Sequence, residues 1–478
     1  MKRNLILISI LVAMLGFTSC NDWLDVRPKS QILAEDHFSR EAGFHDQIIG
    51  VLTMMGSEYM YGREMTFGLM EVLAQTYDLE VNNAYRYAVR YEFMHPTVRP
   101  RIDRIWNNTF NAIANLNVML EFIEKADPNI FRDNNRKVFE GEALGLRAFL
   151  HFDMLRIFAP SYAYNPSALA IPYVTTTAPI VTPTKTVSEA LDFIIADLDR
   201  AIALLEYDTI RSRETWTPNR RAFFNYYAAI ATLARVHMWR GDHDNALKYA
   251  EMIIAVDESA PGNRPFSWTH YSARVSTEPR SRNRLFTPEM IFYLRITNMA
   301  DLVNPWFRAG PNLAANVNAL TLNEVREEYV FELHRGLGSD DRRFFTTEGP
   351  VRYLSKFWQG EDWVVNNHMP LIRKTEAYYI AAEIHNARGN HARAVELLNI
   401  VRSHRSIDAH PLDHTSLTPS EIQEEIFKEY RKEFLGEGQL FFYFKRRNEP
   451  IIGSGMPATN TIFVLPMPDN EMDFGFRR

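Results

Sequence analysis

The fold of this chain is indicated by two similar stretches, ARVHMWRGDHDNA from Ala234 to Ala246 and AEIHNARGNHARA from Ala382 to Ala394. When they are aligned on Gly241 and Gly389, the residues that also agree are Ala234 and Ala382, His237 and His385, Arg240 and Arg388, His243 and His391, and Ala246 and Ala394. This agreement predicts a repeated structural unit. The two copies stand too far apart in the chain for a tandem array, so a long insertion is expected between them.

The repeated unit is predicted to be a pair of antiparallel helices. In the first copy, Thr217 and Pro218 are typical of a helix start, and apolar residues follow at helical spacing over residues 219–239. Gly241 can adopt the positive φ that ends a helix, and a second helix is expected over about residues 244–256. Small alanines at the crossing allow the two helices to approach closely. The pattern resembles a tetratricopeptide helix pair.

The histidines of the two copies could instead be metal ligands. Within each copy, however, a helix-ending glycine separates the two histidines, so they do not lie on one helical face. Catalytic zinc also normally has three protein ligands. We therefore interpret His237, His243, His385 and His391 as part of the repeat, and we predict neither a metal nor a cofactor.

Further helices are predicted from local signals elsewhere in the chain. Amphipathic segments begin at Arg101 and Gly141, and capping boxes are expected at Thr186 with Glu189 and at Thr418 with Glu421. Short strands are expected at 290–295 and 461–465. Stretches with little periodicity lie at 77–100, 160–185, 260–285, 298–320 and 360–370. The predicted fold is mainly α, with long irregular loops and a few short strands.

The first residues have the layout of a bacterial lipoprotein signal. Two basic residues precede an apolar run from Leu5 to Phe17, which is too short to span a bilayer, and small residues then lead to Cys20. Cys20 is the only cysteine of the chain, so it cannot form an internal disulfide. We predict a signal peptide at residues 1–19, acylation of Cys20 with fatty acids such as palmitate, and a tether over residues 20–36.

Composition and motifs argue against several functions. The net charge of −6 and the pI near 6.2 leave no basic surplus for a phosphate backbone, so no nucleic-acid partner is predicted. We assign no catalytic residues, because the sequence motifs of zinc proteases, α/β-hydrolases and P-loop enzymes are absent. Neighbouring carboxylates such as Asp340 with Asp341, or Glu424 with Glu425, leave glycoside hydrolysis as a competing interpretation.

Motifs along nearly the whole chain resemble one known family. After Cys20 the sequence continues as DWLDVRPKSQI, and the other motifs are MEVLAQTYD (70–78), ANLNVMLEFI (114–123), GEALGLRAFLHFDMLRIFA (141–159), DFIIADLDRAIALL (192–205), SDDRR (339–343), LIRKTEAYYIAAE (371–383), LLNIVRSHR (397–405), EYRKEFLGEGQLFFYFKRRN (429–448) and FVLPMPDNE (463–471). In this order, they are similar to the SusD/RagB family of outer-membrane nutrient-binding lipoproteins.

The resemblance implies a single α domain over residues 37–478 that is built on about four tetratricopeptide-like helix pairs. Its N-terminal region would cover about 37–230 and its C-terminal region about 270–478. It also implies a non-enzymatic role at the outer membrane. A lipid-anchored protein at the cell surface would capture a ligand and deliver it to a SusC-type TonB-dependent transporter. The ligand implied is most often an oligosaccharide, and some members of the family serve peptide uptake instead.

Loop aromatics with polar neighbours are the candidates for a ligand site, because sugars present apolar C–H faces rimmed by hydroxyl groups. The candidates in regions that resemble the family's ligand-facing loops are Tyr85, Arg86, Tyr87, Trp268, Tyr271, Trp306 and Arg308. Arg86 and Arg308 could also pair with an acidic sugar or a peptide carboxylate. Two alternatives stay open, namely that these rings pin the loops to the helices and that the helix pairs hold a peptide in their concave face. Trp358 and Trp363 fit either role, whereas Trp106 and Trp239 are expected in the core.

Overall fold

The computed structural model describes residues 34–211, 218–259, 264–278, 280–349, 351–360 and 362–475. The predicted signal peptide, Cys20, most of the tether and the predicted helix cap at Thr217 lie outside these ranges. Within the described ranges, no helix is both long and apolar enough to cross a membrane.

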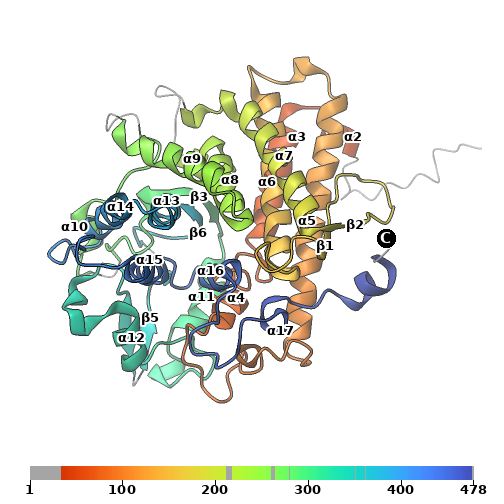
Figure 1. The fold of residues 1–478 in the computed structure, drawn as a ribbon. Helices are drawn as coiled ribbons and strands as arrows, with labels where there is room; N and C mark the ends of the chain where they lie inside the picture. Colours follow the sequence, from red (N-terminus) through yellow and green to blue (C-terminus); the bar gives the residue numbers. More distant parts are fainter. Residues whose placement is uncertain are drawn as a thin grey trace, which may run out of the picture.

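The elements carry the labels of Figure 1. The helices are α2 (Ala34–His37), α3 (Glu41–Met55), α4 (Leu69–Leu73), α5 (Arg99–Lys125), α6 (Asn135–Phe158), α7 (Val187–Leu204), α8 (Tyr226–Arg240), α9 (His243–Ile254), α10 (Tyr271–Arg274), α11 (Met299–Phe307), α12 (Glu324–Phe331), α13 (Thr375–Ala387), α14 (His391–Ser403), α15 (Pro419–Glu433), α16 (Leu440–Arg447) and α17 (Asn460–Phe463). The strands are β1 (Leu169–Pro172), β2 (Thr184–Thr186), β3 (Met290–Arg295), β4 (Phe345–Glu348), β5 (Val351–Leu354) and β6 (His368–Arg373).

Helices that follow one another in the chain pack side by side (Figure 1). α5, α6, α7, α8 and α9 form one such series, and α9 then contacts α13, which packs against α14 and α15. Within the described residues, the strands pair as two-stranded antiparallel sheets, β1 with β2, β3 with β6 and β4 with β5. The expected fold class, mainly α with tetratricopeptide-like helix pairs, is therefore confirmed.

The two quoted stretches form equivalent helix–turn–helix units. α8 ends at Arg240 and is followed by Gly241, whose φ is +79°. α13 is likewise followed, two residues after its last residue Ala387, by Gly389, whose φ is +78°. The next residue in each copy, Asp242 or Asn390, caps the second helix by accepting the backbone N–H three residues later. The positive φ expected from the two glycines is therefore present in both copies.

Two of the repeat histidines, His237 and His391, make contacts within their own helix pairs, whereas His385 lies 3.9 Å from Glu251 of α9. The Nδ1 atom of His237 lies 3.0 Å from the Oδ2 atom of Asp242, and the ring of His237 stacks on Tyr249 of α9. In the second copy, the Nδ1 atom of His391 lies 3.0 Å from the Oδ1 atom of Asn386. These rings join the end of one helix to the start of the next.

The first helix of the unit begins later than the sequence predicts. Residues 218–222 form a short 3-10 turn, and α8 starts at Tyr226 with Asn225 as its cap. The side-chain oxygen of Asn225 accepts the N–H of Ala228 at 3.0 Å, while its amide donates to the carbonyl of Ile291 at 2.8 Å. This bond to β3 places the cap at Asn225, and it depends on a residue distant in sequence.

A comparison of two glycines tests the turn of the repeat. Gly241→Ala is expected to destabilise the protein by about 1–2 kcal/mol, because its backbone is left-handed although an added Cβ would meet no other atom. Gly50→Ala is the matched control, since Gly50 lies inside α3 without a positive φ and has equal free space. We expect it to stabilise by about 0.5–1 kcal/mol. Urea unfolding measures both, and a change of the same sign in the two variants would contradict the conformational role of Gly241.

One predicted strand is confirmed and the other is wrong. β3 occupies residues 290–295 as predicted and pairs with β6. Within residues 461–465, by contrast, the chain forms the end of α17, after which the N–H of Leu465 donates to the carbonyl of Ile157 at 3.1 Å. That bond to the end of α6 is a long-range contact, which local periodicity does not reveal. Part of the stretch 298–320, expected to be irregular, is helical as α11.

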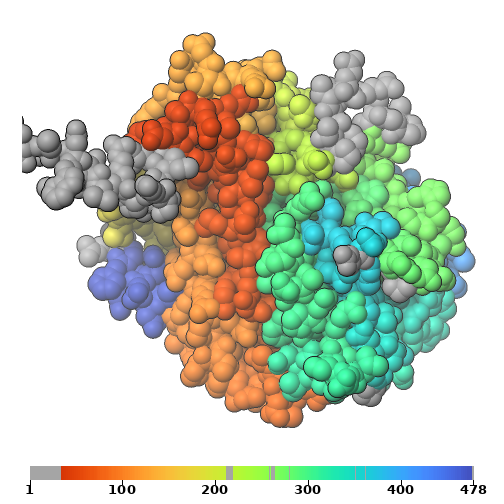
Figure 2. Space-filling model, turned by 180° about the vertical axis from the view of Figure 1, so that it is seen from behind, coloured from red at the N-terminus to blue at the C-terminus, as the bar shows by residue number. Residues whose placement is uncertain are grey.

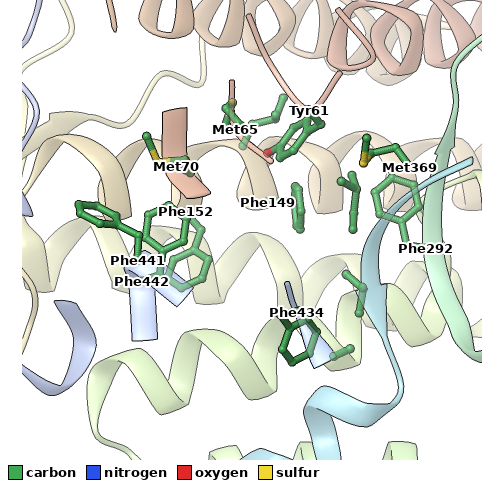
Figure 3. Packing of buried hydrophobic residues seen from close by; sticks show 14 of the residues in the cluster. Tyr61, Met65, Met70, Phe149, Phe152, Phe292, Met369, Phe434, Phe441 and Phe442 are labelled. Carbon is green, nitrogen blue, oxygen red and sulfur yellow. The ribbon is translucent and has the colours of Figure 1, made fainter. Parts of the chain in front are cut away.

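α6 lies at the centre of the hydrophobic core, and every residue from Gly141 to Phe158 is buried. Figure 3 shows Phe149 and Phe152 of this helix among side chains from distant parts of the chain, including Phe292 of β3 and Phe442 of α16. The two halves of the chain thus share one continuous core. Trp106 and Trp239 are buried in it, as predicted.

A network of buried ion pairs joins α15 to the elements around it. The carboxylate of Glu433 contacts Arg373 at 2.7 Å, Arg405 at 2.7 Å and Arg342 at 3.3 Å. Arg405 also contacts the buried carboxylate of Glu289 at 2.6 Å. The buried Glu433 therefore connects β6, the segment after α14 and the loop before β4.

Candidate ligand-binding face

Three loops that are distant in sequence are tied together by backbone and side-chain hydrogen bonds. The N–H of Asp78 donates to the carbonyl of Thr321 at 2.8 Å, and Thr321 forms a second β-bridge with Tyr353. The amide of Asn83 donates to the carbonyl of Val317 at 3.1 Å. We call the resulting surface the loop face; it consists of residues 78–95, 306–321, 345–349, 351–360 and 362–366. Because its loops support one another, side chains on it are held in place.

Tyr85 and Trp306 belong to two of these loops, and their rings contact each other in the interior, with centroids 5.1 Å apart. Both side chains are buried, and the hydroxyl of Tyr85 donates to the buried carboxylate of Glu64 at 2.9 Å. The guanidinium groups of Arg63 and Arg101 lie over the rings of Trp306 and Tyr85, at 4.8 and 4.6 Å. Burial, followed by the charge of Glu64, raises the pKa of Tyr85 well above its usual value. These contacts tie the loops to α5.

Arg86 and Tyr87 lie closer to the surface than Tyr85 does. The ring of Tyr87 stacks on His95 at 3.5 Å with an interplanar angle of 12°, and the guanidinium of Arg86 lies 4.7 Å from the Tyr87 centroid. All three side chains are half-buried. The stacked rings and the guanidinium group therefore remain partly accessible.

Arg308 belongs to a cluster of arginines and tryptophans. Its guanidinium contacts the carboxylate of Glu348 at 3.0 Å and lies 3.9 Å from the centroid of Trp358 and 5.8 Å from that of Trp363. Trp358 is buried and donates its indole N–H to the carbonyl of Phe307 at 2.6 Å. Trp363, by contrast, is half-buried. The structure therefore separates two tryptophans that the sequence left equivalent.

A second arginine of this cluster was not singled out by the sequence. The guanidinium of Arg284 lies 4.2 Å from the centroid of Trp363. Burial and the nearby charges of Arg308 and Arg282 lower the pKa of Arg284 to about 9. Neither Arg284 nor Glu348 stands in a recognisable motif, so only the folded loops identify them.

Trp268 and Tyr271 make their contacts elsewhere, beside the α13–α14 pair. The indole of Trp268 stacks on His404 at 4.1 Å, and the ammonium group of Lys374 lies 4.0 Å from its centroid. This tryptophan therefore already has partners within the protein. Tyr271, at the start of α10, is 58% exposed. The structure thus divides the sequence candidates between the loop face and this second location.

Comparison with known proteins places the chain in a family. The family model described as "Starch-binding associating with outer membrane" matches residues 22–238, and the model described as "SusD family" matches residues 308–461. The chain belongs to the SusD/RagB family. This family associates with the outer membrane and consists of nutrient-binding and glycan-binding proteins.

Similar SusD-type proteins are known from several bacteria. SusD-like protein P38 of Formosa agariphila is 21% identical over 92% of this chain and 91% of that protein. A SusD superfamily protein from Bacteroides thetaiotaomicron superimposes with a TM-score of 0.73 at 20% identity, covering 91% of this chain and 98% of that chain. A laminarin-binding SusD-like protein superimposes with a TM-score of 0.67 at 18% identity, covering 91% and 97%. These structures share the fold of this SusD/RagB chain.

SusD/RagB proteins are binding proteins, and the acidic residues considered for hydrolysis are engaged in ion pairs. Asp340 contacts Arg342 at 2.6 Å, and Asp341 contacts Arg274 in the interior. Glu425 is likewise paired, with Arg335 at 2.8 Å. Such pairing gives these carboxylates structural partners, whereas a glycosidase uses two carboxylates that flank a substrate bond.

Proposed function

We propose that this SusD/RagB protein captures an oligosaccharide on its loop face at the cell surface and delivers it to a SusC-type TonB-dependent outer-membrane transporter. The observation that carries the proposal is the half-buried indole of Trp363 near Arg308, which itself contacts Glu348, on loops that are tied to one another. The laminarin-binding neighbour supports an oligosaccharide as the ligand class. Acylation of Cys20 keeps the protein at the outer membrane in this proposal.

The chemistry of the loop face suits a saccharide. The indole of Trp363 offers an apolar surface to the C–H face of a sugar ring, while Arg308 donates hydrogen bonds to hydroxyl groups and Glu348 accepts them. Arg86 and Tyr87 supply a second group of contacts on the same face. We assign the buried Tyr85 and Trp306 to the support of these loops, and we retain the exposed Tyr271 as an alternative contact.

Binding to a glycan array tests the proposed site. The soluble form that starts after Cys20 is expected to bind oligosaccharides, laminarin fragments among the probes. Trp363→Ala should weaken that binding about tenfold or more, because a central aromatic contact typically contributes over 1 kcal/mol. Tyr164→Ala is the matched control, since this ring is half exposed and lies outside the loop face. Its binding should equal that of the unaltered protein.

The other outcomes of the array assign the site or the ligand differently. Unchanged binding by Trp363→Ala together with loss in Tyr271→Ala would move the site to α10. No binding on the glycan array together with binding on a peptide array would place the protein with the peptide-uptake members of the family. Release of reducing ends from a bound glycan would overturn the proposal, because a binding protein leaves the glycan intact.

A further inference from the structure

A separate concave pocket lies between α3, the first turns of α6 and residues 207–209 and 219–223. Its volume is about 480 Å³, within the range of small-molecule sites. Figure 2 shows α3, in red, beside the yellow-green part of the chain that follows α7. We call it the α3–α6 pocket. None of the residues that line it belongs to the loop face.

Aromatic rings form the walls of this pocket. The ring of His45 lies 5.7 Å from that of Phe223 and 6.3 Å from that of Phe139. Tyr207 stands at the mouth and is 46% exposed. Rings from three different elements therefore line one opening, which gives a flat ligand apolar surfaces to contact.

The floor of the pocket consists of one arginine between two buried carboxylates. Arg220 donates two hydrogen bonds to Asp208, at 2.7 and 2.9 Å, and also contacts Glu142. Asp208 accepts two further backbone N–H groups, from Ile210 and Tyr226, so its oxygens are well satisfied. For Glu142, Arg220 is the only polar contact within the described residues. A carboxylate can accept about four hydrogen bonds, so Glu142 has unused capacity toward the pocket that it lines.

Hydrogen bonds hold the rim of the pocket in place. The carboxylate of Glu41, in the first turn of α3, accepts the N–H of Arg132 at 2.9 Å and the side-chain amide of Asn135 at 2.5 Å. This contact joins the start of α3 to the start of α6. The opening is therefore built from preorganised elements, which lowers the entropy loss on binding.

The charges and polar groups of the residues that line the pocket favour one class of ligand over others. The carboxylates of Glu41, Glu142 and Asp208 outnumber the guanidinium groups of Arg132 and Arg220, which disfavours an anion. A cation would compete with Lys137, whose ammonium already lies 3.9 Å from the centroid of Tyr207. A purely apolar ligand would leave Glu142 desolvated without a new partner. A neutral ring with hydroxyl groups can place its apolar face against the aromatic rings of the pocket and can hydrogen-bond to Glu142 through its hydroxyl groups.

We propose that the α3–α6 pocket binds a saccharide ring and is a second site, distinct from the loop face. The apolar face of the ring lies against Phe223 and Tyr207, and its hydroxyl groups hydrogen-bond to Glu142 and Asn135. Burial raises the pKa of Glu142 to about 7 despite the opposing charge of Arg220, so at neutral pH this carboxyl group can accept or donate a hydrogen bond. The site goes beyond the proposed uptake function and does not depend on it.

Saturation-transfer NMR on the mature full-length protein tests this site, with free glucose, galactose, mannose and N-acetylglucosamine as probes. At least one of these sugars is expected to bind, and Tyr207→Ala and His45→Ala should each weaken that binding, by about tenfold for Tyr207→Ala. Both residues are well exposed, so the variants are expected to fold. Glu142→Gln should weaken binding as well, because it replaces one carboxyl oxygen by an amide nitrogen that cannot accept a hydrogen bond.

The loop face provides the comparison that separates the two proposals. Tyr207→Ala and His45→Ala should leave oligosaccharide binding on the array unchanged, whereas Trp363→Ala should reduce it. If none of the four sugars binds, or if binding is unaffected by both His45→Ala and Tyr207→Ala, the second site is overturned. Loss of the sugar signal in Trp363→Ala alone would assign it to the loop face.

Discussion

Replacing Glu433 by glutamine is expected to lower the free energy of unfolding by about 3–5 kcal/mol, because it leaves buried guanidinium groups without their shared anion. The carboxylate is fully buried and contacts Arg342, Arg373 and Arg405. Each arginine keeps at least one other carboxylate partner, which is Asp340 for Arg342, Glu437 for Arg373 and Glu289 for Arg405. Among the described residues, however, only Glu433 contacts all three. Urea unfolding of the two proteins measures the difference.

Glu424→Gln is the matched control for this change. Glu424 lies on the same helix, α15, but its side chain is 63% exposed and its ion pair is with Lys428 at 3.3 Å. Exposed pairs contribute little, so the change in unfolding free energy should stay within about 0.5 kcal/mol. Similar losses in both variants would show that burial of the Glu433 network is not what stabilises the fold.

The same network predicts a dependence of stability on pH. Burial alone raises the pKa of Glu433, but the charges of Arg405 and Arg373 outweigh it and bring the pKa well below its usual value. A carboxyl group with a lowered pKa stabilises the folded state above its unfolded pKa of about 4.3, and this contribution is lost as the pH falls further. The stability difference between the unaltered protein and Glu433→Gln should therefore be full at neutral pH and shrink below about pH 4.

Cys20→Ala is expected to move most of the protein from the membrane fraction to the soluble fraction while leaving its folding unchanged. Each buried methylene of an acyl chain contributes about 0.8 kcal/mol, so the acyl chains of a lipidated cysteine suffice for stable attachment. The described residues contain no helix that could replace them. Cell fractionation combined with circular dichroism measures attachment and folding separately.

Asn21→Ala is the control for membrane attachment, because it alters the neighbouring residue and keeps the thiol that would be acylated. This variant should remain with the membranes. If Cys20→Ala also remained there, an acyl anchor at Cys20 would not be the attachment, and the surface of the folded body would have to supply it.

The candidate site was only partly predictable from the sequence. Aromatic residues in aperiodic stretches identified the region around Tyr85 and Trp306, because rings without helical spacing stand out in a chain of amphipathic helices. Whether an aromatic side chain is buried or accessible to a ligand depends on which other loop packs against it. The bridges between Asp78, Thr321 and Tyr353 decide that question, and they join residues far apart in the chain.

The sequence by itself determined the helix pairs, because their signals are local: apolar spacing, the caps at Thr186 and Thr418, and glycines that accept a positive φ. It also determined β3, a short run of apolar residues. Only the tertiary structure decided that Trp358 is buried while Trp363 is half-buried, that Glu348 meets Arg308, and that α8 starts at Tyr226. These outcomes depend on hydrogen bonds and ion pairs between distant segments, which form only when the whole chain has packed.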